Sequence, residues 1–174
     1  AVNWRQMPQT YGAYTVKNQS VDNLTLIGGY VYQRYGIKTD LNTTTQSILL
    51  NANYKVSDAV NVTAYDYMLS DVHDTLGLRL TGSVDTGGLS LGYHAEYAQQ
   101  SDASQLDKKD DADPIDATYR RLAVNASTAG FTVGAGQEVL GGAANAGEKG
   151  FTTPLATLHK WQGWADVYLG RTAV

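Results

Sequence analysis

Polar side chains recur at every second position along several stretches of the chain, and these are the residues whose types could do chemistry. They include basic, acidic, amide and hydroxyl groups, and the positions between them are mostly apolar. A mixed set on one face suits the lining of a water-filled pore, where side chains replace hydration contacts of ions or polar solutes. The predicted pore-lining residues are Asn51, Asn53, Lys55, Asp66, Arg79, Thr81, His94, Glu96, Arg121, Asn125 and Glu138.

The charged members of this set allow two interpretations. Opposite charges such as Arg79 and Glu96 are expected to meet across neighbouring strands, where they either act on solutes or form ion-pair ladders with a purely structural role. Both interpretations require an aqueous interior, because an unpaired charge in a dry interior costs several kcal/mol. The sequence leaves both open.

Motifs of enzymes and metal sites are missing from the sequence. There is no cysteine, no G-x-S-x-G or H-E-x-x-H motif and no phosphate-binding glycine loop. The acidic run at 107–114 lacks the spacing and glycine of an EF-hand and is expected to be a solvated loop. A net charge of −4 disfavours nucleic acid as a partner. We therefore expect no enzyme, no cofactor and no metal.

The elements that must position the polar residues are β-strands. From Leu89 to Tyr97, apolar and polar residues alternate strictly, and stretches beginning near Ile48, Leu76, Leu122 and Phe131 repeat the pattern. Period-two alternation predicts strands with one wet and one apolar face. About eight such strands predict an all-β fold, an antiparallel up-and-down transmembrane β-barrel. The predicted lipid-facing residues are Leu50, Tyr54, Tyr67, Leu78, Leu91, Tyr93, Tyr97, Val124, Phe131 and Val133.

One strand, at 60–69, has apolar residues on both faces, so its alternation does not fix its orientation. A carboxylate facing lipid at mid-membrane costs kilocalories. Asp66 is therefore predicted to face inward, which turns Tyr65, Tyr67 and Leu69 outward.

The connections are predicted to alternate in length. Short turns rich in Asn, Asp, Gly and Ser are expected at 18–23, 57–59, 85–88 and 127–130, with longer loops at 36–46, 70–74, 99–116 and 141–174. Short turns on one side and long loops on the other are typical of outer-membrane barrels. The prediction is a single barrel domain or barrel portion over 1–174, with 99–116 and 141–174 as long outer loops.

The composition agrees with a membrane barrel. Charged residues make up 17% of the chain, below the roughly 25% of soluble domains. The 12 Tyr far outnumber the 2 Phe, which favours aromatic belts at a lipid–water boundary over a dry core. No apolar run is long enough for a membrane-spanning helix. The chain begins at Ala1, so we expect either a processed leader or a piece of a longer protein.

Several segments together resemble the porin-like outer-membrane proteins of the alginate-export family, in its C-terminal portion. They are NWRQMPQTYGAYTVKN at 3–18, LLNANYKVSDAVNVTAYDYML at 49–69, TLGLRLTGS at 75–83, EYAQQSDA at 96–103 and GQEVLGGAANAGEKGFTTPLATLHKWQGWADVYL at 136–169. The resemblance implies a large barrel in the outer membrane of Gram-negative bacteria. The predicted lumen is mixed in charge, so specificity for alginate does not carry over.

These observations predict a porin-like channel for passive diffusion of small polar or ionic solutes. The expected partners are the lipid bilayer, lipopolysaccharide and those solutes, and the oligomeric state is left open. The alternative is a closed, narrow barrel of eight strands with a structural or adhesive role, because eight strands leave an interior filled by side chains. A soluble barrel that binds a small ligand is a third reading.

Overall fold

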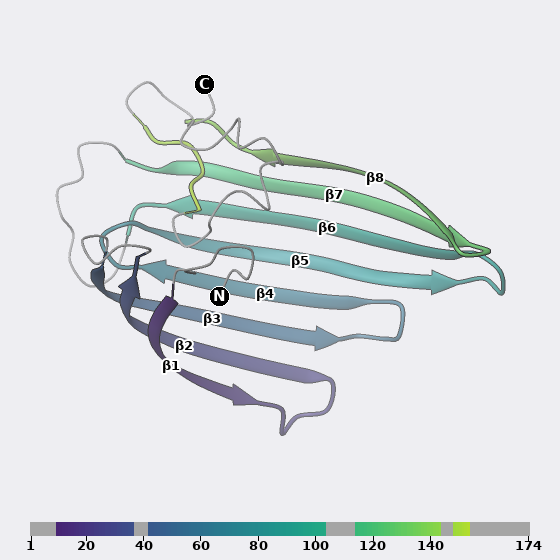
Figure 1. Cartoon of the computed structure of the whole chain (residues 1–174), viewed down its shortest axis with the longest axis horizontal. Coiled ribbons are helices and arrows are strands. Elements are labelled where there is room, and N and C mark those ends of the chain that lie inside the picture. The colour runs from purple at the N-terminus through teal and green to yellow at the C-terminus, as the bar shows by residue number, and fades with distance from the viewer. Residues whose placement is uncertain (1–9, 37–41, 104–113, 144–147, 154–174) are drawn as a thin grey trace.

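The computed structural model describes residues 10–36, 42–103, 114–143 and 148–153, and these ranges form one antiparallel sheet of eight strands in sequence order (Figure 1). This confirms the all-β up-and-down fold. No helix within these ranges is long and apolar enough to cross a membrane. The strands are β1 (Thr10–Asn18), β2 (Leu24–Tyr35), β3 (Thr43–Lys55), β4 (Asn61–Leu69), β5 (His73–Asp85), β6 (Ser90–Ser101), β7 (Asp116–Thr128) and β8 (Phe131–Leu140).

The first and last of these strands are the two edges of the sheet. β1 pairs only with β2 and β8 only with β7 among the described strands. The described sheet is therefore an open, curved wall, and it does not close into the narrow eight-stranded barrel that was the alternative prediction. Residues 1–9 lie outside the described ranges.

The turns at one end of the sheet follow their expected chemistry. β7 and β8 are joined by Ala129 and Gly130, both with positive φ, as a two-residue hairpin turn requires. Between β5 and β6, the Gly87 N–H donates to Asp85 Oδ1 at 2.8 Å. These hairpin turns form one end of the sheet, which we call the turn end; the opposite end is the loop end.

The loop end differs from the prediction in two places. The expected long loop at 70–74 is a turn of only residues 70–72, in which Asp71 has a φ of 59°. β6 continues to Ser101 and β7 begins at Asp116, so the connection predicted over 99–116 is shorter at both ends. Strong pairing between β5, β6 and β7 extends the ladder into positions whose polar residues suggested a loop.

The register separates the side chains into two faces, because directly opposed residues in a sheet point to the same side. Arg79 lies opposite Glu96, and Glu96 lies opposite Arg121, which defines the polar face. In the neighbouring pair of the same ladder, Leu78 lies opposite Tyr97, and this pair defines the apolar face. All predicted pore-lining residues except Asp66 lie on the polar face, and all predicted lipid-facing residues except Tyr67 lie on the apolar face.

The two exceptions belong to β4, whose predicted orientation is wrong. Asp66 lies opposite Leu50 and Leu76 on the apolar face, while Tyr67 lies opposite Leu49 and Thr75 on the polar face. Tyr65 and Leu69 turn to the polar face with Tyr67, because each is two positions from it along the strand.

Two physical reasons explain this error. Asp66 stands three residues before the end of β4 at Leu69, or about 10 Å along the strand, so its carboxylate is near the loop end rather than halfway along the wall. A tyrosine ring carries a polar hydroxyl, so it can occupy a wet face as readily as an apolar one. The inward Tyr65 uses that hydroxyl in a hydrogen bond to Glu96.

Burial is concentrated at the loop end of the polar face. Ala98, Ala117 and Leu69 are at most 4% exposed, and His73 and Gln100 are buried with them. The large side chains of the apolar face are instead open, with Leu78 57% exposed and Phe131 76% exposed. The wall therefore has its apolar side chains on the outside, the reverse of a globular protein in water.

Close packing between β4 and β5 depends on a glycine. The ring of Tyr65 lies across Gly77, its direct partner in the ladder, and a Cβ on Gly77 would come within 2.2 to 2.5 Å of two ring carbons and the hydroxyl oxygen. Any side chain at this position must push the ring away from the polar face of β5.

We predict that Gly77→Ala destabilises the folded protein by about 1–3 kcal/mol, the range for overpacked sites. Urea unfolding in detergent micelles measures the change. Gly28→Ala is the matched control, because a Cβ on Gly28 meets only Leu50, at 3.9 Å. Equal stability changes in the two variants would contradict the packing of Tyr65 over Gly77.

Candidate functional site

A four-residue cluster on the polar face is built around the carboxylate of Glu96. Arg79 donates from Nε to Oε2 at 2.9 Å and from Nη2 to Oε1 at 2.8 Å. The Tyr65 hydroxyl donates to Oε1 at 2.8 Å, and His94 Nε2 lies 2.9 Å from Oε2. Both oxygens of Glu96 thus have two partners each, which compensates the desolvation of a side chain that is only 6% exposed.

Three neighbouring strands position this cluster. Arg79 on β5 lies directly opposite Glu96 on β6, and Tyr65 reaches Glu96 from β4 by crossing over Gly77. Tyr67 stacks on Tyr65 with ring centroids 4.8 Å apart. The Arg79 guanidinium lies 5.7 Å from the centre of the Tyr65 ring, within cation–π range. These ring contacts hold Tyr65 in place beside Glu96.

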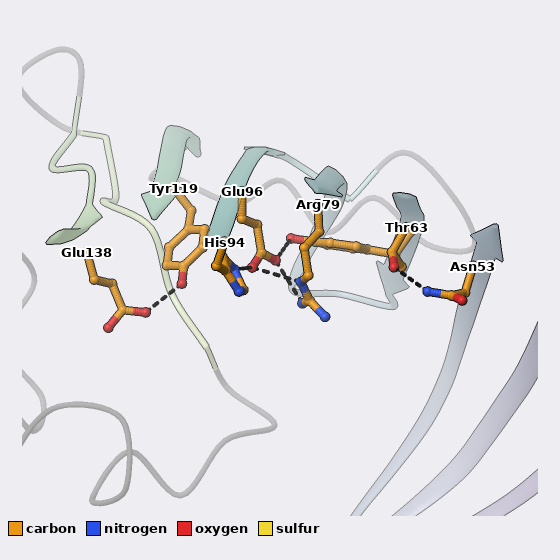
Figure 2. Close-up of polar contacts among 8 residues, drawn as sticks. Asn53, Thr63, Arg79, His94, Glu96, Tyr119 and Glu138 are labelled. Carbon is orange, nitrogen blue, oxygen red and sulfur yellow. Dashed lines mark hydrogen bonds and ion pairs between the residues drawn. The ribbon is translucent and has the colours of Figure 1, made fainter. Parts of the chain in front are cut away.

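Two further polar contacts extend the row across the sheet (Figure 2). On one side, the Asn53 amide donates to the Thr63 hydroxyl at 2.7 Å. On the other side, the Tyr119 hydroxyl donates to Glu138 Oε1 at 2.5 Å. The row thus has members on each strand from β3 to β8. Most of its contacts join adjacent strands, and the hydrogen bond from Tyr65 to Glu96 spans β5.

The other predicted polar residues occupy different positions on the same face. Lys55 lies at the turn end and binds Asp58 at 2.6 Å, which lowers the pKa of that exposed carboxyl. Thr81 lies opposite His94. The Asn125 amide lies against Gly92, where a Cβ would come within 2.6 Å of it. Asn51 lies opposite Tyr65.

Arg121 differs from Arg79 in its partners. It lies directly between Glu96 and Glu138 in the ladder, yet within the described residues no ion pair joins it to either. Glu96 is occupied by Arg79 and His94, and Glu138 accepts from Tyr119. The guanidinium of Arg121 therefore has no carboxylate partner among the described residues.

A hollow of about 620 Å³ lies on the polar face, and five of the predicted pore-lining residues line it: Arg79, His94, Glu96, Arg121 and Glu138. The wall contributes residues from β3 to β8, and the segment 148–153 bounds the hollow at the loop end through Phe151, Thr152 and Thr153. Side chains of both charges, amides and aromatic rings thus face one space. No group of three or more potential metal ligands occurs in the part of the chain that the structure describes.

Sequence reasoning missed several residues of this site. Tyr65, His73 and Gln100 line the hollow, but His73 was expected in a loop, Gln100 at the start of one, and Tyr65 on the opposite face. Tyr119 also lines the hollow and was not among the predicted pore-lining residues. The available signal was the two-residue repeat of a strand. Counted in steps of two, Thr75 and His73 continue the polar face of β5 from Arg79, and Gln100 continues that of β6 from Glu96.

The apolar face carries a continuous belt. Along β6 it reaches from Leu89, just before the strand, to Tyr97, which is 50% exposed. Eight steps of about 3.3 Å give roughly 27 Å along the strand, or about 20 Å in height at a tilt near 40°. Above Tyr97, the row of Asp66, Gln99 and Thr118 ends the belt. Tyr93 lies in the belt and donates to the Ala59 carbonyl at 2.7 Å.

Solved structures share the fold of this sheet. Pseudomonas aeruginosa OccK8 (OprE) matches with a TM-score of 0.66 at 16% identity, over 78% of this chain and 42% of that chain. A BenF-like porin from Pseudomonas fluorescens Pf-5 matches with 0.67 at 15% identity, over 79% and 37%. Acinetobacter baumannii OccAB4 matches with 0.66 at 17% identity, over 79% and 37%. The chain has the fold of a porin wall.

The matched part is about two fifths of the length of these structures. No protein-family model matches the sequence, and no curated protein matches it. The likeness is therefore one of fold, to outer-membrane porins of the Occ type and a BenF-like porin. It does not extend to the alginate-export family, and that assignment stays a prediction.

We predict a strong energetic coupling between Arg79 and Glu96. A double-mutant cycle with Arg79→Met and Glu96→Gln, read by urea unfolding, should give about 1–3 kcal/mol, because the pair is bidentate and Glu96 is buried.

The exposed pair Lys55 and Asp58 is the control, since solvent screens its 2.6 Å contact. The same cycle there, with Lys55→Met and Asp58→Asn, should show no measurable coupling. A coupling at Arg79 and Glu96 no larger than this control would show that the cluster does not stabilise the wall.

Proposed function

We propose that this chain forms part of the wall of an outer-membrane porin-like channel through which small polar or ionic solutes diffuse passively. The observation that carries the proposal is the two-faced wall: a belt of exposed apolar side chains on one side and a charged, hollowed face on the other. Successive residues of one strand, such as Leu78 and Arg79, then face hydrocarbon and water. The similar solved structures support the same reading because they include a porin.

The lipid bilayer is the partner that fits the apolar face. Val124 and Val133 are 62% and 74% exposed, a loss of burial that water would penalise and lipid would not. In a bacterial outer membrane, the loop end would face the lipopolysaccharide leaflet, because long connections gather there and short turns at the other end.

The polar face favours anionic solutes. On the strands of this face, the basic side chains Lys17, Lys55, Arg79 and Arg121 outnumber the acidic Asp85, Glu96 and Glu138. Arg121 has no ion-pair partner within the described ranges. One similar structure, Pseudomonas aeruginosa OpdK, was determined with vanillate. A carboxylate matches the fork of a guanidinium well.

The competing readings fit less well. A narrow closed barrel needs β1 paired with β8, and these strands lie at opposite edges of the described sheet. A soluble ligand-binding barrel would have to expose the belt of Leu78, Tyr97, Leu122 and Phe131 to water.

We predict that tryptophan placed on the two faces of β7 reports two environments. With Trp4, Trp161 and Trp164 changed to Phe, Val124→Trp should be strongly quenched by brominated lipids, because position 124 lies in the belt. Asn125→Trp, the next residue, is the control and should be quenched by aqueous iodide instead. Equal quenching of both by brominated lipid would contradict the membrane placement.

We further predict that the full-length protein forms open channels in a planar bilayer, with anions preferred over cations. Arg121→Gln should shift the reversal potential in a salt gradient towards cations, because it removes the unpaired charge on the polar face.

Arg120→Gln is the matched control, since Arg120 is the neighbouring residue on the apolar face, opposite Tyr97. It should leave the reversal potential unchanged. Absence of channels from correctly refolded protein would overturn the proposed function. Channels in which both substitutions have the same effect would overturn the anion preference alone.

A further inference from the structure

The segment 148–153 leaves the edge of the sheet and lies back against its polar face. Figure 1 shows this yellow segment crossing β7 towards β6. Its backbone is attached at two places: the Lys149 N–H donates to the Pro114 carbonyl and the Phe151 N–H donates to the Gly141 carbonyl, both at 2.9 Å. Phe151 also packs on Tyr119, with ring centroids 5.5 Å apart. These contacts hold the segment near β7 and β8.

A third attachment reaches farther, to β6. The side-chain amide of Gln100 meets both backbone groups of Thr152: Oε1 accepts from the Thr152 N–H at 2.7 Å, and Nε2 donates to the Thr152 carbonyl at 3.0 Å. Two residues 52 positions apart are thereby joined by two hydrogen bonds, one in each direction, as between two backbone amides in a β-sheet.

The Gln100 side chain is itself fixed by the wall. It is 1% exposed, and its Nε2 lies 3.0 Å from the Thr75 hydroxyl and 3.2 Å from His73 Nε2. His73 Nδ1 in turn lies 3.2 Å from the Thr75 hydroxyl. Gln100 therefore has a single position, with its amide presented to the segment. A buried amide in such a place is costly unless its polar atoms are paired.

We propose that Gln100 is a positioning residue that holds the segment 148–153 inside the channel and so limits the size of solute that passes. This rests on the proposed function, since a size limit has meaning only for an open channel. Thr152 and Thr153 border the same hollow as Arg79, Glu96 and Arg121. Release of the segment from β6 would widen the hollow at its loop end while leaving the charged row in place.

The test compares Gln100→Leu with the wild type in the full-length protein reconstituted in planar bilayers. Leucine keeps most of the buried volume but can neither accept from nor donate to Thr152. The expected result is a higher single-channel conductance and passage of larger polyethylene glycols, with the ion selectivity unchanged. Selectivity separates this role from general damage to the wall, which would disturb the charged row as well.

Gln99→Leu is the matched control, because Gln99 is the adjacent residue on β6 and turns to the apolar face, where it binds Asp116 at 2.5 Å. It should leave conductance and polymer exclusion as in the wild type. Thr152→Pro is a second variant that leaves the strands of the wall unchanged, since it removes the N–H and the hydroxyl of Thr152 that donate to Gln100. It should change both measurements in the same direction as Gln100→Leu.

Each outcome decides between the two proposals. Wild-type channels together with unchanged conductance and exclusion in Gln100→Leu and Thr152→Pro overturn the role of Gln100 and leave the channel standing. The same holds if Gln99→Leu changes them as much as Gln100→Leu does. If Gln100→Leu does not fold, Thr152→Pro alone carries the decision. A wild-type protein without channels overturns both proposals.

Discussion

The pairing register of β4, β5 and β6 is the constraint on which the rest of this structure depends. Arg79 and Glu96 meet because they are direct partners in the ladder, and Tyr65 reaches them because its own partner is a glycine. A slip of one residue would turn every side chain of a strand to the other face. It would carry Arg79 into the apolar belt and Leu78 into the hollow, so the site and the outer surface are fixed together.

Tight turns and glycines set the register along the whole sheet. Ala129 and Gly130 adopt positive φ in a two-residue turn, which leaves β7 and β8 one way to align. Gly77 gives room to Tyr65, and Gly92 gives room to the Asn125 amide. These glycines thus lie inside strands, where large polar side chains from the next strand pass over them. Side-chain size alternates across the polar face as a result.

Alternation alone predicted most of the wall but not all of the site. Leu78 and Arg79 could be assigned to opposite faces because β5 alternates strictly, whereas β4 is apolar on both sides and Asp66 misled the assignment. The number of strands and the short turns followed from local patterns. The contact between Gln100 and Thr152 could not, because it joins residues 52 positions apart, and nothing local to either residue encodes it.

The distribution of charge likewise follows from the three-dimensional pairing of the strands and not from the composition of the chain. The chain as a whole is acidic, with a net charge of −4, yet the polar face carries more basic than acidic side chains. The register resolves the difference: Asp66 turns to the apolar face above the belt, and Asp74 and Asp116 continue that rim as ladder neighbours of Met68 and Ser101. Three carboxylates therefore lie on the apolar face at the loop end, while the hollow is lined by Arg79 and Arg121 together with Glu96 and Glu138. Since a charge acts most strongly on the nearest, least screened groups, the local set of charges on the polar face determines the electrostatic field in the hollow, and the net charge of the chain does not.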